Sequence, residues 1–145
     1  VAVNDSRKRA MGRKIIAACG GSVRGKKIAV LGLTFKPNPD DMRDAPSIDI
    51  IELLQKDGAK IRAYDPQALK NAKRILKDVT FCRDPYEAAK SASLAIIVTE
   101  WDEFKEMNLK KLKELMKQPI IIDGRNIYDP KKLRSLGFSY LGVGR

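Results

Sequence analysis

The chain has 145 residues, 43% of them hydrophobic, and this suffices to bury the core of one domain. It contains no histidine, so metal sites and catalytic triads that depend on histidine are excluded. No apolar run approaches the roughly 18 residues that a membrane-spanning helix needs. The first residues, V-A-V-N-D, contain neither an initiator methionine nor the apolar part of a signal peptide. We therefore expect part of a longer cytoplasmic protein, without a membrane partner.

The two cysteines, Cys19 and Cys82, lie far apart in the sequence and form no C-x-x-C motif. Neither a zinc site nor a disulfide framework is indicated, and we expect no bound metal. Free cysteine is among the most often buried residue types. We predict that both thiols are reduced and have a structural role.

The net charge of +11 first suggests a polyanionic partner such as nucleic acid. The basic residues, however, are spread along the chain and fall mainly on predicted solvated helix faces, for example Lys110, Lys111, Lys113 and Lys117. No aromatic residues alternate with them, and no nucleic-acid-binding module is recognisable. We expect an anionic small ligand and no nucleic acid.

The first predicted element is a helix from about residue 4 to residue 19, because Met11, Ile15 and Ile16 recur at helical spacing. Asn4 or Asp5 is suited to cap its start, and the glycines at 20–21 end it. Its dense basic face and its place before the first strand suggest the downstream end of a longer helix from an upstream domain. A peripheral helix that covers one edge of the sheet is an equally good interpretation.

Alternating apolar strands and amphipathic helices follow, which is the pattern of a parallel sheet with right-handed crossovers. The predicted strands are residues 27–33, 60–64, 79–81, 94–98, 120–122 and, at an edge, 139–141. The predicted helices are residues 47–56, 67–76, 86–90, 109–116 and 130–136. This predicts an α/β fold, a Rossmann-like doubly wound parallel sheet of about five to six strands with flanking helices. Such sheets bind ligands outside the carboxyl ends of their strands.

Three segments follow those carboxyl ends, at residues 31–46, 99–102 and 123–126, and we expect them to meet at one crevice. The first strand is followed by G-L-T-F-K instead of G-x-G-x-x-G. The backbone turn that cradles the pyrophosphate of a dinucleotide is therefore missing. The sequence predicts a Rossmann-like domain that is not a complete NAD site by itself.

Cationic side chains in the first segment are suited to bind a phosphate or carboxylate, Lys36 as a point charge and Arg43 as a bidentate fork. An ion pair within the loop is an alternative role for Arg43. Asp44 precedes a predicted helix start at residues 46–47, so helix capping is its simpler interpretation. Trp101, in the second segment, is either a packing residue or a neighbour of the nucleotide.

The loop sequence G-L-T-F-K-P-N-P-D-D-M-R-D-A-P-S closely resembles the C-terminal, UDP-binding domain of the UDP-glucose 6-dehydrogenase family. The motifs V-T-E-W-D-E-F, D-G-R-N-I-Y-D-P and G-F-S-Y-L-G-V-G-R extend this resemblance over essentially the whole chain. The form D-D-M-R-D-A-P favours the UDP-glucose branch over the related GDP-mannose and UDP-N-acetylmannosamine dehydrogenases. The opening V-N-D-S-R-K-R-A-M-G-R-K-I resembles the end of the family's long central helix. The resemblance thus implies a division into residues 1–21, the end of that helix, and 22–145, the UDP-sugar-binding domain.

The resemblance implies oxidation of UDP-glucose to UDP-glucuronate by two hydride transfers to NAD, through a thiol-bound intermediate. In that family the NAD-binding domain and the nucleophilic cysteine, in a G-G-S-C-F-P-K-D type motif, lie upstream of the region seen here. Residues 19–22 have similar letters in a different order, so Cys19 is not assigned as the nucleophile. We expect no catalytic residue in this chain, no activity from it alone, NAD bound mainly elsewhere, and a homo-oligomeric parent that serves polysaccharide synthesis.

By the same resemblance, Phe35 and Lys36 contact the substrate, UDP-glucose or its product UDP-glucuronate. Arg125 binds the substrate as well, and Arg43 reaches the NAD of the neighbouring domain. The positions of Lys36 and Arg125, just past strand ends, independently suit charge-assisted binding of a diphosphate. Two other hypotheses remain at this point: a stand-alone nucleotide-binding regulatory module and a basic nucleic-acid-binding domain.

Overall fold

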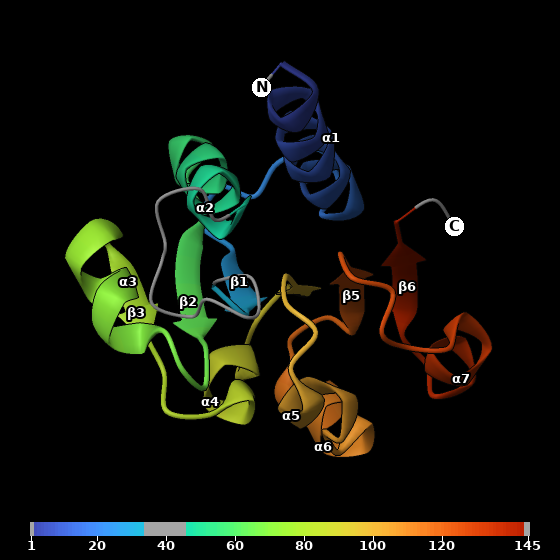
Figure 1. Ribbon diagram of the computed structural model, residues 1–145. Coiled ribbons are helices and arrows are strands. Elements are labelled where there is room, and N and C mark those ends of the chain that lie inside the picture. The colour runs from blue at the N-terminus through green and yellow to red at the C-terminus, as the bar shows by residue number, and fades with distance from the viewer. Residues whose placement is uncertain (1, 34–45, 144–145) are drawn as a thin grey trace.

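The structure, a computed structural model, describes residues 2–33 and 46–143, with side chains for 10–33 and 47–143, and is built on a six-stranded parallel sheet. The strands are β1 (Lys27–Leu31), β2 (Lys60–Tyr64), β3 (Val79–Phe81), β4 (Leu94–Ile97), β5 (Ile120–Asp123) and β6 (Ser139–Gly142). They lie in the order β3-β2-β1-β4-β5-β6, with every neighbouring pair parallel (Figure 1). The predicted doubly wound α/β sheet is confirmed.

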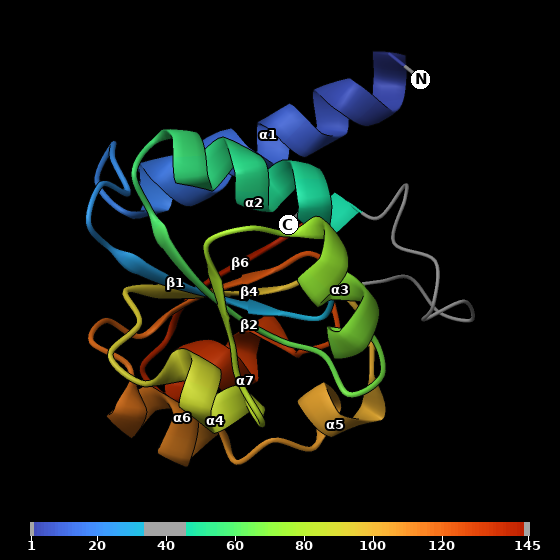
Figure 2. The ribbon, with the colours of Figure 1, turned by 90° about the vertical axis from the view of Figure 1, so that its left-hand side faces the viewer.

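Helices cover both faces of this sheet (Figure 2). They are α1 (Ala2–Ala18), α2 (Pro46–Lys56), α3 (Leu69–Ile75), α4 (Pro85–Ala89), α5 (Asp102–Lys105), α6 (Leu109–Leu115) and α7 (Pro130–Ser135). Buried side chains of α1, α2 and α3 form one apolar cluster with the sheet, and those of α4 to α7 form another on the opposite face. Because both faces are covered, the central strands β1 and β4 consist of buried apolar residues from Ile28 to Leu31 and from Leu94 to Ile97.

Within β1 the side chains alternate between the two clusters. Ile28 and Val30 join the cluster of α1, α2 and α3, whereas Ala29 and Leu31 join the other. This is the two-residue period of an extended strand. It explains why a run without polar residues, which shows no alternation in the sequence, still belongs to a strand.

Most predicted elements are confirmed, with ends that differ by one or two residues. β1 ends at Leu31, because the chain turns at Gly32, which has a φ of 97°. β4 ends at Ile97, shortly before a bend at Thr99. The short helix α5 was not predicted; it is a single turn whose preceding residue, Trp101, makes no side-chain capping hydrogen bond. The glycine stops are confirmed, since Gly58 and Gly137 adopt φ values of 89° and 97°.

Helix α1 packs on α2 and also contacts the edge strand β6. Ile15 is fully buried, and the ammonium of Lys14 donates a hydrogen bond of 2.8 Å to the carbonyl of Gly142 at the end of β6. Cys19 and Cys82 are both free and buried, as predicted. The boundary near residue 21 and the continuation of α1 into an upstream domain stay predictions.

Candidate functional site at the carboxyl edge of the sheet

The direction of chain winding reverses between β1 and β4, which are neighbours in the sheet although β2 and β3 come between them in sequence. Ligands of open parallel sheets bind at such a switch point, outside the carboxyl ends of the strands. Gly32 and Thr99 meet there. A Cβ on Gly32 would lie only 2.8 Å from the backbone nitrogen of Thr99 and would collide with its side chain. Both this approach and the positive φ require glycine at position 32.

Asp65, one residue beyond β2, is 1% exposed and collects hydrogen bonds from both sides of the switch point. Its Oδ1 accepts from the backbone N–H groups of Gln67 at 2.8 Å and Ala68 at 2.9 Å. Its Oδ2 accepts from the N–H of Leu33 at 2.8 Å and from the indole Nε1 of Trp101 at 3.2 Å. One carboxylate thus joins the segments that follow β1, β2 and β4.

Leu33 is held through its carbonyl oxygen as well as through its N–H. The hydroxyl of Ser47, in the first turn of α2, donates to the carbonyl of Leu33 at 2.6 Å. This hydrogen bond ties the residue that follows β1 and Gly32 to the first turn of α2. The predicted ligand residues Phe35, Lys36 and Arg43, and the predicted capping residue Asp44, lie between these two anchors and outside the described residues.

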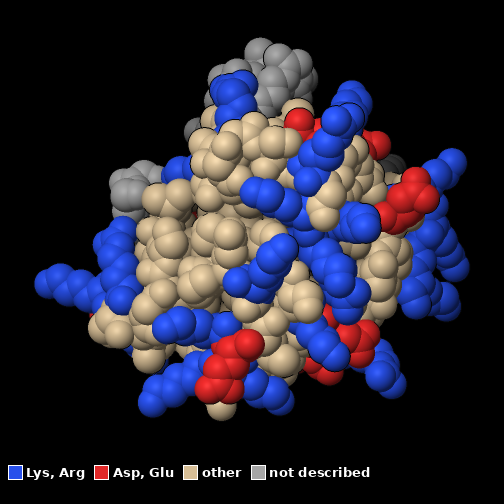
Figure 3. Space-filling model, turned by 180° about the vertical axis from the view of Figure 1, so that it is seen from behind, with Lys and Arg blue, Asp and Glu red and all other residues tan. Residues whose placement is uncertain are grey.

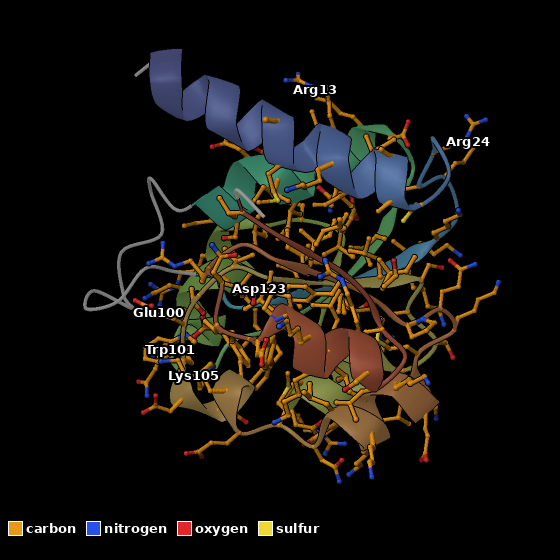
Figure 4. The ribbon with its side chains drawn as sticks, turned by 90° about the vertical axis from the view of Figure 1, so that its right-hand side faces the viewer. Arg13, Arg24, Glu100, Trp101, Lys105 and Asp123 are labelled. Atoms are coloured by element: carbon orange, nitrogen blue, oxygen red, sulfur yellow. The ribbon has the colours of Figure 1, made fainter. Side chains whose placement is uncertain are left out.

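Arg125 follows β5 and lies at the same edge. Its backbone N–H donates to Oδ1 of Asp123 at 3.1 Å, and its guanidinium forms an ion pair of 3.4 Å with Glu100. The two side chains of this pair are 37% and 47% exposed, so solvent reaches the guanidinium. Figure 4 shows Glu100 and Trp101 at the edge opposite Arg24, with Asp123 between them and the centre. In the described part of the chain, the second and third predicted segments thus meet.

Asp123 fixes the backbone around Arg125. Its carboxylate is fully buried, and Oδ2 accepts from the N–H of Tyr128 at 3.0 Å and from the hydroxyl of Tyr140 at 2.7 Å. Burial, followed by the charge of Asp123, raises the pKa of Tyr128 far above that of an ordinary tyrosine. The phenol therefore stays protonated and donates to the carbonyl of Phe104 at 2.5 Å.

The residues at the ends of β1 and β2 do not fit NAD, although a dinucleotide-binding domain would hold NAD there. In such domains an acidic residue near the end of the second strand binds the ribose hydroxyls. Asp65 occupies that position here, but its carboxylate is 1% exposed and engaged by the N–H groups of its neighbours. Together with the missing glycine-rich turn after β1, this excludes a standard dinucleotide site at β1 and β2.

The described residues were also searched for a metal site, for a membrane-spanning helix and for clustered surface charge. Among residues 2–33 and 46–143, no group of three or more acidic or cysteine side chains is placed to hold a metal ion. No helix within those ranges is long and apolar enough to cross a membrane. The face seen from behind in Figure 1 carries lysine and arginine spread over most of its width, among few acidic side chains (Figure 3).

Sequence reasoning named Arg125 as a candidate and placed Thr99 and Glu100 in the second of the three predicted segments without a role of their own, but it missed Asp65. Thr99 is 2% exposed, and its Oγ1, buried beside Gly32, has no hydrogen-bond partner among the residues that the structure describes. The signal for Asp65 was the sequence Y-D-P directly after a strand, because aspartate before proline is typical of a turn in which the carboxylate binds nearby N–H groups.

The fold and this edge define a Rossmann-like α/β domain that lacks the dinucleotide turn and whose candidate site lies at the switch point. The model of the UDP-glucose/GDP-mannose dehydrogenase family, UDP binding domain, matches residues 29–130, and the chain belongs to this family. The UDP-glucose 6-dehydrogenase of Rhizobium meliloti (strain 1021) is 53% identical over 145 residues, which are 100% of this chain and 33% of that protein.

Two further relatives agree with this assignment. The UDP-glucose 6-dehydrogenase TuaD of Bacillus subtilis (strain 168) is 48% identical over 126 residues, 86% of this chain and 27% of that protein. The solved structure of a UDP-glucose dehydrogenase from Pyrobaculum islandicum has a TM-score of 0.76 at 29% identity, over 95% of this chain and 30% of that one. The chain therefore spans about a third of the length of the relatives it matches.

Proposed function

We propose that this chain is the UDP-sugar-binding domain of a UDP-glucose 6-dehydrogenase, and that the complete protein oxidises UDP-glucose to UDP-glucuronate with two NAD. The observation that carries the proposal is Arg125, a partly exposed guanidinium at the switch-point edge of a domain that belongs to this family. A guanidinium binds a phosphate through two parallel hydrogen bonds, which suits it to a nucleoside diphosphate. In this proposal the diphosphate takes the place of Glu100 as the partner of Arg125.

The remaining ligand contacts come from the segment between Leu33 and Ser47. In the proposal Phe35 and Lys36 contact the sugar nucleotide, and Arg43 reaches across to the NAD of a neighbouring domain. Both anchors of this segment lie at the edge that carries Arg125, because the Ser47 hydroxyl donates to the Leu33 carbonyl. The segment therefore starts and ends where the ligand would lie.

Catalysis by the complete protein requires parts that this chain does not contribute. Burial raises the pKa of both thiols, Cys19 and Cys82, above that of an ordinary cysteine, which suits a structural role and not a nucleophile. NAD, for its part, does not fit at Asp65. We expect the isolated chain to bind UDP but to reduce no NAD when UDP-glucose is supplied. The cytoplasmic location, the homo-oligomeric parent and the supply of UDP-glucuronate to polysaccharide synthesis also stay predictions.

The proposal is tested by calorimetric titration of the chain with UDP, UDP-glucose and UDP-glucuronate, with GDP as the competing nucleotide. A charge-assisted hydrogen bond contributes roughly 1.5 to 3 kcal/mol, so Arg125→Ala should weaken UDP binding about tenfold or more. Lys36→Ala should have a similar effect. Arg125→Ala should unfold near the wild-type temperature, since a partly exposed charge contributes little to stability.

Arg24→Ala is the matched control, because Arg24 is an exposed arginine at the opposite edge of the sheet (Figure 4). It should bind UDP as tightly as the wild type. Equal UDP affinity in the wild type and in Arg125→Ala would contradict the proposed site. Tighter binding of GDP than of UDP would instead favour a related nucleotide-sugar dehydrogenase.

A further inference from the structure

We propose that Asp65 is a positioning residue of the nucleotide-sugar site, which holds the Leu33 backbone and the Trp101 indole on opposite sides of the switch point. The inference rests on the proposed function, because it assumes that a UDP-sugar binds at this edge. It adds a residue whose carboxylate does not need to touch the ligand. Asp65 acts through the two groups that it holds.

The two oxygens of Asp65 have separate tasks. Within the described part of the chain, Oδ1 accepts from Gln67 and Ala68, two and three residues further along, and so shapes the turn before α3. Oδ2 accepts from Leu33 and Trp101, which lie 32 and 36 residues away in sequence. A carboxylate that served only to cap a turn would need the first pair of bonds and not the second.

The bonds to Oδ2 reach both sides of the candidate site. Leu33 is the last described residue before the segment that returns at Ser47, whose hydroxyl donates to the Leu33 carbonyl. Trp101 follows Glu100, whose carboxylate pairs with Arg125 at 3.4 Å. Fixing Leu33 and Trp101 to one buried oxygen therefore sets the distance between the β1 side and the β4–β5 side of the edge.

Asp65→Asn separates positioning from capping. The amide oxygen of asparagine can keep the two bonds to Gln67 and Ala68, since asparagine forms the same turn. Its NH₂ group then faces the N–H of Leu33 and the indole N–H, and two donors cannot bond each other. We expect UDP to bind about tenfold more weakly to this variant.

Trp101→Phe provides a milder variant that tests the same link if Asp65→Asn folds poorly. It removes the indole N–H and keeps an aromatic ring, so we expect a loss of UDP affinity of about threefold. In the double variant the loss should be smaller than the product of the two single effects, because both changes break the same hydrogen bond. Fully multiplicative effects would show that Asp65 does not act through Trp101.

The chain has one tryptophan, so its fluorescence reports on Trp101 alone. UDP should change the emission of the wild type, and the emission of ligand-free Asp65→Asn should already differ from that of the ligand-free wild type. Asp57→Asn is the matched control: Asp57 also accepts a backbone N–H from another segment, Val23 at 2.8 Å, but before β2, at the opposite edge of the sheet. It should leave both UDP affinity and emission unchanged.

The outcomes distinguish the two proposals. If the wild type binds no UDP by calorimetry, the proposed function fails and this inference fails with it. If the wild type binds UDP but Asp65→Asn and Trp101→Phe bind it equally well, or UDP leaves the Trp101 emission unchanged, the inference alone is wrong. Weaker binding by Asp65→Asn and Trp101→Phe, with Asp57→Asn unaffected, supports it.

Discussion

Asp65 and Asp123 occupy corresponding places in the two halves of the sheet, and they join very different parts of the chain. Both carboxylates lie at the carboxyl edge, and their residues are 1% and 0% exposed. The partners of Asp123 are Arg125, Tyr128 and Tyr140, all within the β5–β6 half. Asp65 also bonds its own neighbours, but one of its oxygens binds Leu33 and Trp101 across the switch point.

Under the proposal for Asp65, the same chemical group serves stability in one half of the sheet and site geometry in the other. Burial of a carboxylate is costly unless N–H or O–H groups donate hydrogen bonds to it. Each aspartate therefore also fixes the positions of the groups that donate to it. Two of the donors to Asp123 belong to Tyr128 and Tyr140, and both of these tyrosines are buried. Asp123 should therefore matter most for folding, and Asp65 for ligand binding.

The largest expected effect follows from the removal of Asp123. In Asp123→Ala the N–H of Tyr128 and the hydroxyl of Tyr140 lose a buried acceptor, and the free energy of unfolding should fall by about 3 kcal/mol or more. Tyr140→Phe removes one donor and keeps the carboxylate, and should cost about 1 to 2 kcal/mol. Urea unfolding measures both. If Asp123→Ala lowers the free energy of unfolding less than Tyr140→Phe does, Asp123 is not the residue that stabilises the β5–β6 half.

The next effect concerns Gly32, which lies beside Thr99 at the switch point. Gly32→Ala places a methyl group against Thr99 in a conformation with positive φ, and should cost about 2 to 3 kcal/mol of folding free energy. Gly20→Ala is the matched control, because Gly20 has a φ of 89° but no described residue lies within 4 Å of the added Cβ. It should cost only about 1 kcal/mol. Equal losses in the two variants, measured by thermal unfolding, would show that the contact with Thr99 is not tight.

Tyr128, a donor to Asp123, gives a pH-dependent prediction. Its folded pKa is raised, chiefly by burial, above the value of about 10 in an unfolded chain. The stability gained by keeping the phenol protonated is therefore complete below about pH 10 and is lost as the pH rises from there towards the folded pKa. Below pH 10, Tyr128→Phe should be less stable than the wild type by about 1 to 2 kcal/mol, because the carbonyl of Phe104 loses its donor.

Above about pH 10 the wild type should lose stability faster than Tyr128→Phe, by up to about 1.4 kcal/mol per pH unit. The gap between the two proteins should therefore narrow in this range. Unfolding curves from pH 8 to pH 11 measure it. Tyr64, whose pKa is also raised by burial and by Glu103, is present in both proteins and cancels in the difference. A gap that stays constant with pH would contradict the raised pKa of Tyr128.

The parts of the fold that follow from local pattern were predictable from the sequence, and the parts that depend on long-range hydrogen bonds were not. The strands are short and mostly apolar and alternate with amphipathic helices, so all six could be located from the sequence pattern, β6 as an edge strand. The position of Arg125 at the carboxyl edge could be predicted because it lies two residues past the end of β5. The role of Asp65 could not, since Leu33 and Trp101 are separated from it by 32 and 36 residues and share no pattern with it. The proposed roles of Phe35, Lys36 and Arg43 remain untested because these residues lie outside the described ranges.

The smallest expected effect concerns Glu100, which pairs with Arg125 at the surface, within the half of the sheet that holds β4, β5 and β6. Both side chains of this pair are more than a third exposed, so Glu100→Gln should change the free energy of unfolding by about 0.5 kcal/mol or less. The same substitution removes a negative charge that competes with a diphosphate for Arg125. UDP should therefore bind up to about threefold more tightly at low salt, and the gain should fade as salt screens the exposed charges. Calorimetric titrations at low and at physiological ionic strength measure both quantities. Weaker UDP binding in Glu100→Gln would mean that Glu100 orients Arg125 for the ligand instead of competing with it.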